Sequence, residues 1–303
     1  MKETIFYKVL VMRDGSIIHN PYATTHKDLI DKYIGRNDIS HKDYFRATFS
    51  PEEEYDLLNV DSYTLKHNEM FIPEWFISNV KETAMDNLKQ IISSMIIKGR
   101  RNLLLNECVI LDENTIVEEA KNSIIFGMFG NSKIRTLDNN TEVHLMKDHA
   151  VIEEMRDGSK VIEMFGFTKI NAMYDYSKVR KMFGQAKVVR MFNNSRIRTL
   201  RGDAAINLMM DKAEAERLRH MSRVDEMHNN AVIEEMWDWT EVGAMFDNAE
   251  IHYMDDDAKV LEMHDSSMII EMAGNSIVEK SYSNSLVRKL NEMAKIIEKK
   301  ITE

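Results

Sequence analysis

The residues best placed to do chemistry in this sequence are cations grouped in its middle. Residues 158–202 contain ten lysines and arginines and only two acidic residues, Glu163 and Asp175. Residues 225–272 contain 14 acidic residues and a single lysine, Lys259. A cluster of cations beside aromatic side chains can bind phosphate groups or the acidic surface of a partner. The other interpretation is a solvated surface whose charges vary without function, and the sequence leaves both open.

Other kinds of site find little support. Six of the ten histidines lie inside a repeated part of the chain, and none are spaced as metal ligands. His19, His26, His41 and His67 are scattered in the first hundred residues, where only folding could gather them. Neither phosphate-binding glycine motif occurs, and the paired glycines of calcium-binding nonapeptide rolls are missing. No motif therefore calls for a metal, a cofactor or a catalytic residue.

Composition sets the class of protein. The chain has 303 residues, a net charge of −10 and one cysteine, Cys108. The negative charge disfavours indiscriminate binding to DNA. A single cysteine excludes a disulfide framework and suits the reducing cytoplasm. The first residues lack a signal-peptide pattern, and no stretch reaches 18 apolar residues. We therefore expect a cytoplasmic protein without membrane contact.

A nine-residue unit repeats 18 times without a gap over residues 122–283. Position 2 is Ala, Ser or Thr in every copy, position 4 is Ile or Val in 17, and position 7 is Met in 14. A fixed short period of this kind predicts a solenoid. Small and β-branched residues at alternate positions predict a strand, and the later Met predicts a bend that turns a ladder of methionines into the core.

The corner residues of the repeat alternate, and this sets the size of one coil. Position 9 is Gly in five of the nine odd-numbered units, whereas in eight of the nine even-numbered units it is Asn or Asp. All three residue types suit turns with positive φ. Two alternating corners predict a two-sided coil of about 18 residues with two parallel sheets. A three-sided coil of 27 residues is the alternative.

Stacking of such coils groups the candidate site residues. Residue i lies over residue i+18, so six cations project from one sheet and two phenylalanines lie at its margin. The candidate binding surface consists of Lys160, Lys178, Arg180, Lys181, Arg196, Arg198, Phe165 and Phe183. Like charges on neighbouring strands cost stability, so the segregation of charge along the chain is worth testing.

The sequence divides into three parts. Residues 1–103 lack the repeat and read as a small α+β domain that caps the solenoid of residues 104–284. Apolar residues at helical spacing predict a C-terminal capping helix within residues 285–303. They are Leu286, Leu290, Met293, Ala294, Ile297 and Ile301. The predicted fold is therefore mainly β, a parallel two-sided β-solenoid with an N-terminal α+β capping domain and a C-terminal capping helix.

The unit x-[AST]-x-[IV]-x-x-M-x-[DNG], as in His149-Ala-Val-Ile-Glu-Glu-Met-Arg-Asp157, resembles nonapeptide-repeat proteins of bacterial phages and mobile elements. The segment Pro73-Glu-Trp-Phe76, followed by Leu103-Leu-Leu105, resembles the region before such repeats. Those proteins are largely uncharacterised, so the resemblance implies a context rather than an activity. Pentapeptide-repeat proteins that imitate DNA are similar only at the level of the fold, because the unit length and the basic middle differ here.

We expect a non-catalytic binding protein. A rigid solenoid surface loses little entropy on binding, so it suits recognition of a host or partner macromolecule, as by a phage or mobile-element inhibitor. A protein partner is expected, and a homo-oligomer stays open. One alternative is binding of nucleic acid or another polyanion through the basic surface 160–201. The other is an enzyme based on residues 1–103, with the solenoid as its scaffold.

Overall fold

The computed structural model describes residues 7–23, 25–34, 42–67, 72–282 and 284–300. It separates into two compact units, Met1–Ile97 and Lys98–Glu303. Strand β6 of the solenoid begins at Arg100, within the part of the sequence expected to be α+β. No helix in these described ranges combines the length and apolar character needed to cross a bilayer.

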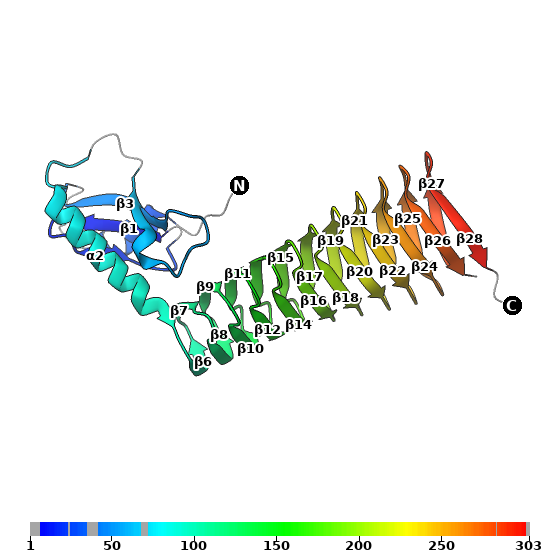
Figure 1. Cartoon of the computed structure of the whole chain (residues 1–303), viewed down its shortest axis with the longest axis horizontal. Coiled ribbons are helices and arrows are strands. Elements are labelled where there is room, and N and C mark those ends of the chain that lie inside the picture. Colours follow the sequence, from blue (N-terminus) through cyan, green and yellow to red (C-terminus); the bar gives the residue numbers. More distant parts are fainter. Residues whose placement is uncertain (1–6, 24, 35–41, 68–71, 283, 301–303) are drawn as a thin grey trace. The chain divides into compact units, whose positions relative to one another are not determined.

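The N-terminal unit is a small antiparallel sheet with helices (Figure 1). Its strands lie in the order β2-β1-β3-β4. The helix α2 carries a buried stripe of Ala84, Leu88, Ile92 and Met95, which is the apolar face of an amphipathic helix. The elements are β1 (Tyr7–Met12), β2 (Ile17–His19), α1 (His26–Leu29) with a π-helical turn over Ile30–Ile34, β3 (Tyr44–Pro51), a 3-10 turn over Val60–Ser62, β4 (Tyr63–Lys66), α2 (Ser78–Met95) and β5 (Ile96–Ile97).

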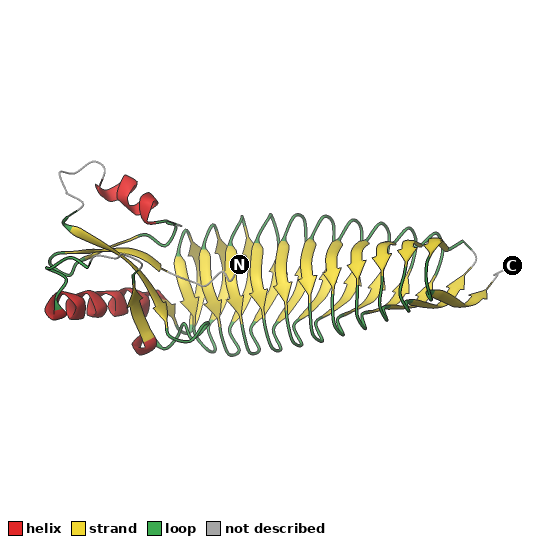
Figure 2. Ribbon diagram, turned by 90° about the horizontal axis from the view of Figure 1, so that it is seen from above, coloured by secondary structure: helices red, strands yellow, loops and turns green. Residues whose placement is uncertain are grey.

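The second unit is a parallel β-solenoid of about 11 turns (Figures 1 and 2). Its strands alternate between two sheets. The odd sheet contains β5, β7 (Cys108–Leu111), β9 (Ile124–Met128), β11 (Glu142–Met146), β13 (Lys160–Met164), β15 (Lys178–Met182), β17 (Arg196–Leu200), β19 (Glu214–Leu218), β21 (Val232–Met236), β23 (Glu250–Met254), β25 (Met268–Met272) and β27 (Leu286–Leu290). The even sheet contains β6 (Arg100–Leu105), β8 (Ile116–Lys121), β10 (Lys133–Asp138), β12 (Val151–Met155), β14 (Lys169–Met173), β16 (Lys187–Met191), β18 (Ala205–Met209), β20 (Arg223–Met227), β22 (Glu241–Met245), β24 (Lys259–Met263), β26 (Ile277–Tyr282) and β28 (Lys295–Lys300).

The register confirms the predicted two-sided coil of about 18 residues, and the three-sided alternative is wrong. Val161 lies beside Val179, and Met164 lies beside Met182, on neighbouring strands of one sheet. Both types of position are buried from β9 to β25, so aliphatic and methionine columns form the core between the two sheets. Figure 2 shows the turns lying along the two edges of the stacked strands.

The corners explain why their residue types alternate. After the even strands, Asn193 and Asn229 adopt positive φ, and their backbone N–H groups donate to the carboxylates of Asp211 and Asp247 at 3.0 and 2.9 Å. Each Asp or Asn therefore fits the left-handed turn and also bonds the corner of the preceding coil. After the odd strands, Gly202 also adopts positive φ, and a Cβ on it would lie 3.2 Å from the backbone N of Gly184.

The predicted C-terminal capping helix is wrong, because residues 286–300 form strands β27 and β28, which extend both sheets. The nine-residue spacing continues here: Ser285 and Ala294 occupy the small buried position and are 5% and 4% exposed. Hydrogen bonding to the preceding coil outweighs the helical spacing of the apolar residues. Several of those that were to face inward are instead exposed, namely Leu286, Leu290, Met293 and Ile297. The capping role of the N-terminal domain stays a prediction.

The buried serines at the small position differ in their hydrogen bonds. Ser195 Oγ has no partner, whereas Ser276 Oγ donates to the carbonyl of Ala273 at 2.7 Å. Because an unpaired buried hydroxyl is costly, we expect Ser195→Ala to raise the free energy of unfolding by about 1 kcal/mol, and Ser276→Ala to lower it by about 1 kcal/mol. Urea unfolding followed by circular dichroism measures both. Equal effects of the same sign would contradict this account.

His19 on β2 makes the N-terminal unit sensitive to acid. Its ring lies 5.9 Å from that of Tyr7, and burial lowers its pKa from the ordinary value of 6.5. Below about pH 6.5 the unfolded chain therefore binds the proton more readily than the folded one, so stability present above that pH is lost as the pH falls. We expect amide exchange of β1 and β2, corrected for intrinsic rates, to accelerate between pH 7.5 and 5.5. In His19→Gln this acceleration should shrink, and an unchanged pH response would exclude His19 as its source.

Candidate binding face of the solenoid

Three neighbouring strands of the odd sheet, β13, β15 and β17, carry the six predicted cations. The register places Lys160 beside Lys178, and Lys178 beside Arg196, which gives one outward column. Arg180 and Arg198 follow two residues later on their strands and therefore point to the same side. Lys181 sits between Glu163 and Thr199 in a further column. These six residues, Lys160, Lys178, Arg180, Lys181, Arg196 and Arg198, are called the cationic face below.

The strand alternation exposes this face and makes it slightly hollow. Val161, Val179 and Ile197 point inward and are at most 1% exposed, so the residues on either side of them point outward. The outward side chains surround a shallow hollow of about 250 Å³. Its lining includes Lys160, Ile162, Lys178, Arg180, Arg196, Arg198 and Glu216. The apolar side chain of Ile162 gives the hollow a nonpolar wall among charged ones.

Carboxylates on the neighbouring strand pair with part of the cationic face. Arg196 lies 2.5 Å from Glu214, and Arg198 lies 3.6 Å from Glu216 on the same strand, β19. Lys181 lies 2.6 Å from Glu163. Within the described residues, Lys160 and Lys178 form no ion pair. The charge available to a partner is therefore centred on β13 and β15. Exposed pairs such as those of Arg196 and Arg198 contribute little to folding stability.

Acidic residues border the cationic face on both sides. Glu142 on β11 lies beside Lys160, and Glu214 on β19 lies beside Arg196. The His144 side chain, 3.2 Å from Glu142, holds the pKa of that carboxyl below its usual value, and Lys160 adds to the effect. The odd sheet is therefore banded, with a cationic stretch three strands wide between two acidic strands.

A second acidic region, called the acidic band below, lies further along the same sheet. It consists of Glu234 on β21 and Glu250 on β23. The His252 imidazole lies between these carboxylates, with Nδ1 2.7 Å from Glu234 and Nε2 3.4 Å from Glu250. No lysine or arginine of the described residues pairs with either carboxylate. Two carboxylates thus share one histidine on an outward surface, which leaves acceptor capacity for a cation.

The two predicted phenylalanines form a stack at the edge of the cationic face. Phe165 follows β13 and Phe183 follows β15, with ring centroids 4.8 Å apart and planes at 13°. Each is followed by a corner glycine, Gly166 or Gly184, at positive φ. The regular spacing of the coils imposes this face-to-face geometry, as it does in other stacked β-structures. The stack lies just beyond the C-terminal ends of β13 and β15, whereas Lys160 and Lys178 begin these strands.

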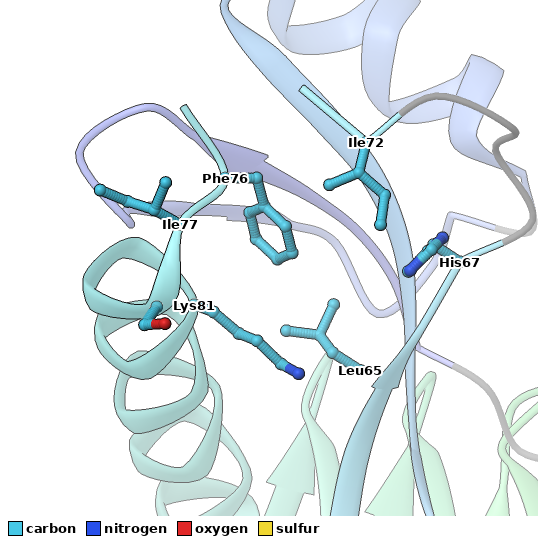
Figure 3. A pocket seen from close by; sticks show the side chains of 7 residues that line it. Leu65, His67, Ile72, Phe76, Ile77 and Lys81 are labelled. Atoms are coloured by element: carbon cyan, nitrogen blue, oxygen red, sulfur yellow. The ribbon is translucent and has the colours of Figure 1, made fainter. Parts of the chain in front are cut away.

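The N-terminal unit contains a pocket of about 390 Å³ (Figure 3). Figure 3 shows Lys81 extending from α2 toward Leu65, with Phe76 above them and His67 on the far side. The ring centroids of Phe76 and Phe45 lie 4.6 Å apart. The His67 ring packs edge-on against the Phe45 ring, with centroids 5.2 Å apart. Of the residues that line the pocket, only His67 and Lys81 are titratable. The described residues of the pocket lining therefore offer one ammonium group, one imidazole and apolar walls, and they include no carboxylate.

The N-terminal histidines are engaged in separate local contacts. His26 Nε2 lies 2.7 Å from the carbonyl of Ala47, His19 is largely buried beside Tyr7, and His67 packs on Phe45. His41 lies outside the described residues. In the part of the chain that is described, no three His, Cys, Asp or Glu side chains group as metal ligands. These contacts therefore do not support the alternative of an enzyme based on this unit.

Sequence reasoning missed the acidic strands that border the cationic face. It grouped residues by the net charge of a segment and ended the basic stretch at residue 202. The 18-residue register, applied to Arg196 and Arg198, leads directly to Glu214 and Glu216. The 18-residue spacing of the sequence therefore already indicated these glutamates. Their presence shows that the surface is banded rather than uniformly basic.

Comparison with other proteins adds no assignment to this geometry. Searches against known protein families, curated proteins and solved structures find no match to this chain. The function is therefore argued from the banded odd sheet itself.

Proposed function

We propose that the chain is a non-catalytic binding protein whose cationic face recognises an acidic surface of a partner protein. The observation that carries the proposal is the in-register column Lys160–Lys178–Arg196, bordered by the acidic strands β11 and β19. Like charges at neighbouring positions of a sheet are unfavourable. Carboxylates of a bound partner relieve that repulsion, so binding and the placement of these charges fit one another.

The rigidity of the solenoid favours this use. Backbone hydrogen bonds of 2.9 to 3.0 Å tie Lys178 N to the Ser159 carbonyl, and Arg196 N to that of Ser177. The Cα positions of the cations are therefore fixed before a partner arrives. A preorganised surface loses less conformational entropy on binding than a flexible one, so the interaction energy of the charges is retained as affinity.

A protein partner fits the banded surface better than a polyanion does. A nucleic acid carries negative charge along its entire length, so a strand that crosses β13 to β19 also meets Glu214 and Glu216. A folded protein can place its own basic groups opposite those acids. Polyanion binding stays a second candidate, because Lys160 and Lys178 lie in register without an ion pair among the described residues, and the stack of Phe165 and Phe183 follows the ends of the same two strands.

The proposed setting follows from the sequence. The nine-residue unit resembles repeats from bacterial phages and mobile elements, so in this proposal the partner is a host protein that the chain inhibits or occupies. The single Cys108 is consistent with a reducing cytoplasm. The N-terminal unit takes no catalytic part in the proposal, and its pocket lined by His67 and Lys81 is not required for binding.

The first test removes the two unpaired lysines. We expect Lys160→Ala combined with Lys178→Ala to abolish co-purification of the partner protein from a bacterial host lysate, because those side chains form no ion pair within the described part of the chain. The matched control is Lys169→Ala with Lys187→Ala, since these lysines also pair in register but lie on the even sheet. Mass spectrometry of the eluted proteins reads the result. A partner retained by the first variant, or lost equally by the control, refutes the proposal.

The second test separates a partner protein from a polyanion. Fluorescence anisotropy with a labelled 30-nucleotide single strand should show no specific binding at 150 mM salt. If polyanion binding is the function, affinity instead falls steeply with salt, and removing Lys160 and Lys178 reduces the slope by about 1.4, roughly 0.7 for each phosphate contact. That slope change would support the second candidate over the first.

A further inference from the structure

The odd sheet carries opposite charges at equal distances from one strand. β17 and β21 lie on either side of β19, and β15 and β23 are the next strands outward. The cationic face thus lies on one side of β19 and the acidic band of Glu234 and Glu250 on the other. Both project from the same sheet of the same rigid rod. When a second copy is placed with its strands in the opposite order, the cations of one copy therefore face the carboxylates of the other.

Two copies can use this complementarity through a two-fold axis. An axis that runs parallel to the strands and passes over β19 reverses the order of the strands and keeps their direction. It sets β15 of one copy opposite β23 of the other, and β17 opposite β21. Parallel rods would instead place each cation opposite its own equivalent, which is unfavourable.

The reversed order brings specific residues together. Equivalent strand positions face one another, so Lys178 meets Glu250 of the second copy and Arg198 meets Glu234. On the outer pair of strands, β13 and β25, Ile162 meets Ile270. The two-fold axis repeats each contact, so every favourable pair occurs twice. The hollow lined by Lys178, Arg180 and Arg198 lies opposite His252 and Glu250 and can receive those side chains.

The centre of the contact is already neutral. Glu214 and Glu216 on β19 meet their own equivalents across the axis, which alone is unfavourable. Arg196 and Arg198 lie 2.5 and 3.6 Å from these carboxylates within each copy. Four arginines and four glutamates therefore meet at the axis, so the centre carries paired rather than like charges.

We propose that the cationic face also binds a second copy of this chain, docked antiparallel through the odd sheet. This inference rests on the proposed function, because it uses the same cations for protein recognition and adds self-association to it. Seven strands of five residues cover roughly 29 Å by 16 Å, or about 900 Å² counted over both copies. That area is at the low end for a specific interface, so the dimer is weak and depends on salt.

Charge exchange tests the docking. Sedimentation velocity of the full chain should show dimers in 20 mM salt at micromolar concentration and monomers in 500 mM salt. Lys178→Glu alone and Glu250→Lys alone should each weaken the dimer at least about tenfold, because each places like charges at both symmetric contacts. Mixed in equal amounts, the two variants should form a heterodimer of wild-type strength, since both contacts are then between opposite charges.

Lys169→Glu on the even sheet carries the same change in charge and should leave the dimer unchanged. Wild-type monomers at about 100 µM in low salt, or a mixture that stays monomeric while circular dichroism shows folded variants, overturn the docking. Either result leaves the recognition of a host protein untouched, because co-purification with the alanine variants tests that separately. Loss of the proposed function with an intact dimer would conversely assign the cationic face to self-association alone.

Discussion

The hydrogen-bonded register between successive coils is the constraint on which every other feature depends. A backbone N–H on one strand bonds a carbonyl one coil earlier, as Lys160 bonds Thr141 at 2.9 Å, and this repeats along both sheets. Because the register places residue i beside residue i+18, the core methionines, the corner residues and the surface charges each form columns along the rod. The side chains of one column have the same environment, which is why the corner after the even strands accepts only residues that tolerate positive φ and bond the preceding corner.

The columns also account for how the surface carries charge. A flexible loop can move its cations apart, whereas Lys160 and Lys178 stay on adjacent strands whatever their repulsion. The neighbouring glutamates on β19 balance part of the charge and leave the rest unpaired. In the proposed function, recognition therefore depends on matching a fixed pattern of charge bands, and specificity depends on the order of the bands rather than on the total charge.

The sequence allowed most of the solenoid to be predicted, because residue type at the corners and at the core positions is imposed by the coil. The alternation of Gly with Asn and Asp was enough to choose two sides over three. The prediction of a C-terminal helix was wrong because Leu286, Leu290, Met293 and Ile297 also satisfy a helical spacing. The strands form because Ser285 and Ala294 occupy the small buried position and pack against the preceding coil. The pocket around His67 and Lys81 had no local signal, since its residues come from segments that only tertiary folding brings together.

The first coils are shorter than the rest, and this has a consequence for how such rods change in evolution. Arg100 pairs with Ile116, and Ile116 pairs with Lys133, so these coils contain fewer residues than the regular coil of 18. The parallel pairing of the strands continues across them. Beyond that point glycine occupies the ninth position of the repeat at one edge only, and most of the Asn and Asp residues occupy it at the other edge. Duplication or loss of one nonapeptide would move glycines to the wrong edge and exchange the two sheets, whereas a pair of nonapeptides can be gained or lost silently. Such genes are therefore expected to grow in steps of two units, and each step inserted between β17 and β21 would shift the charge bands apart by one rung.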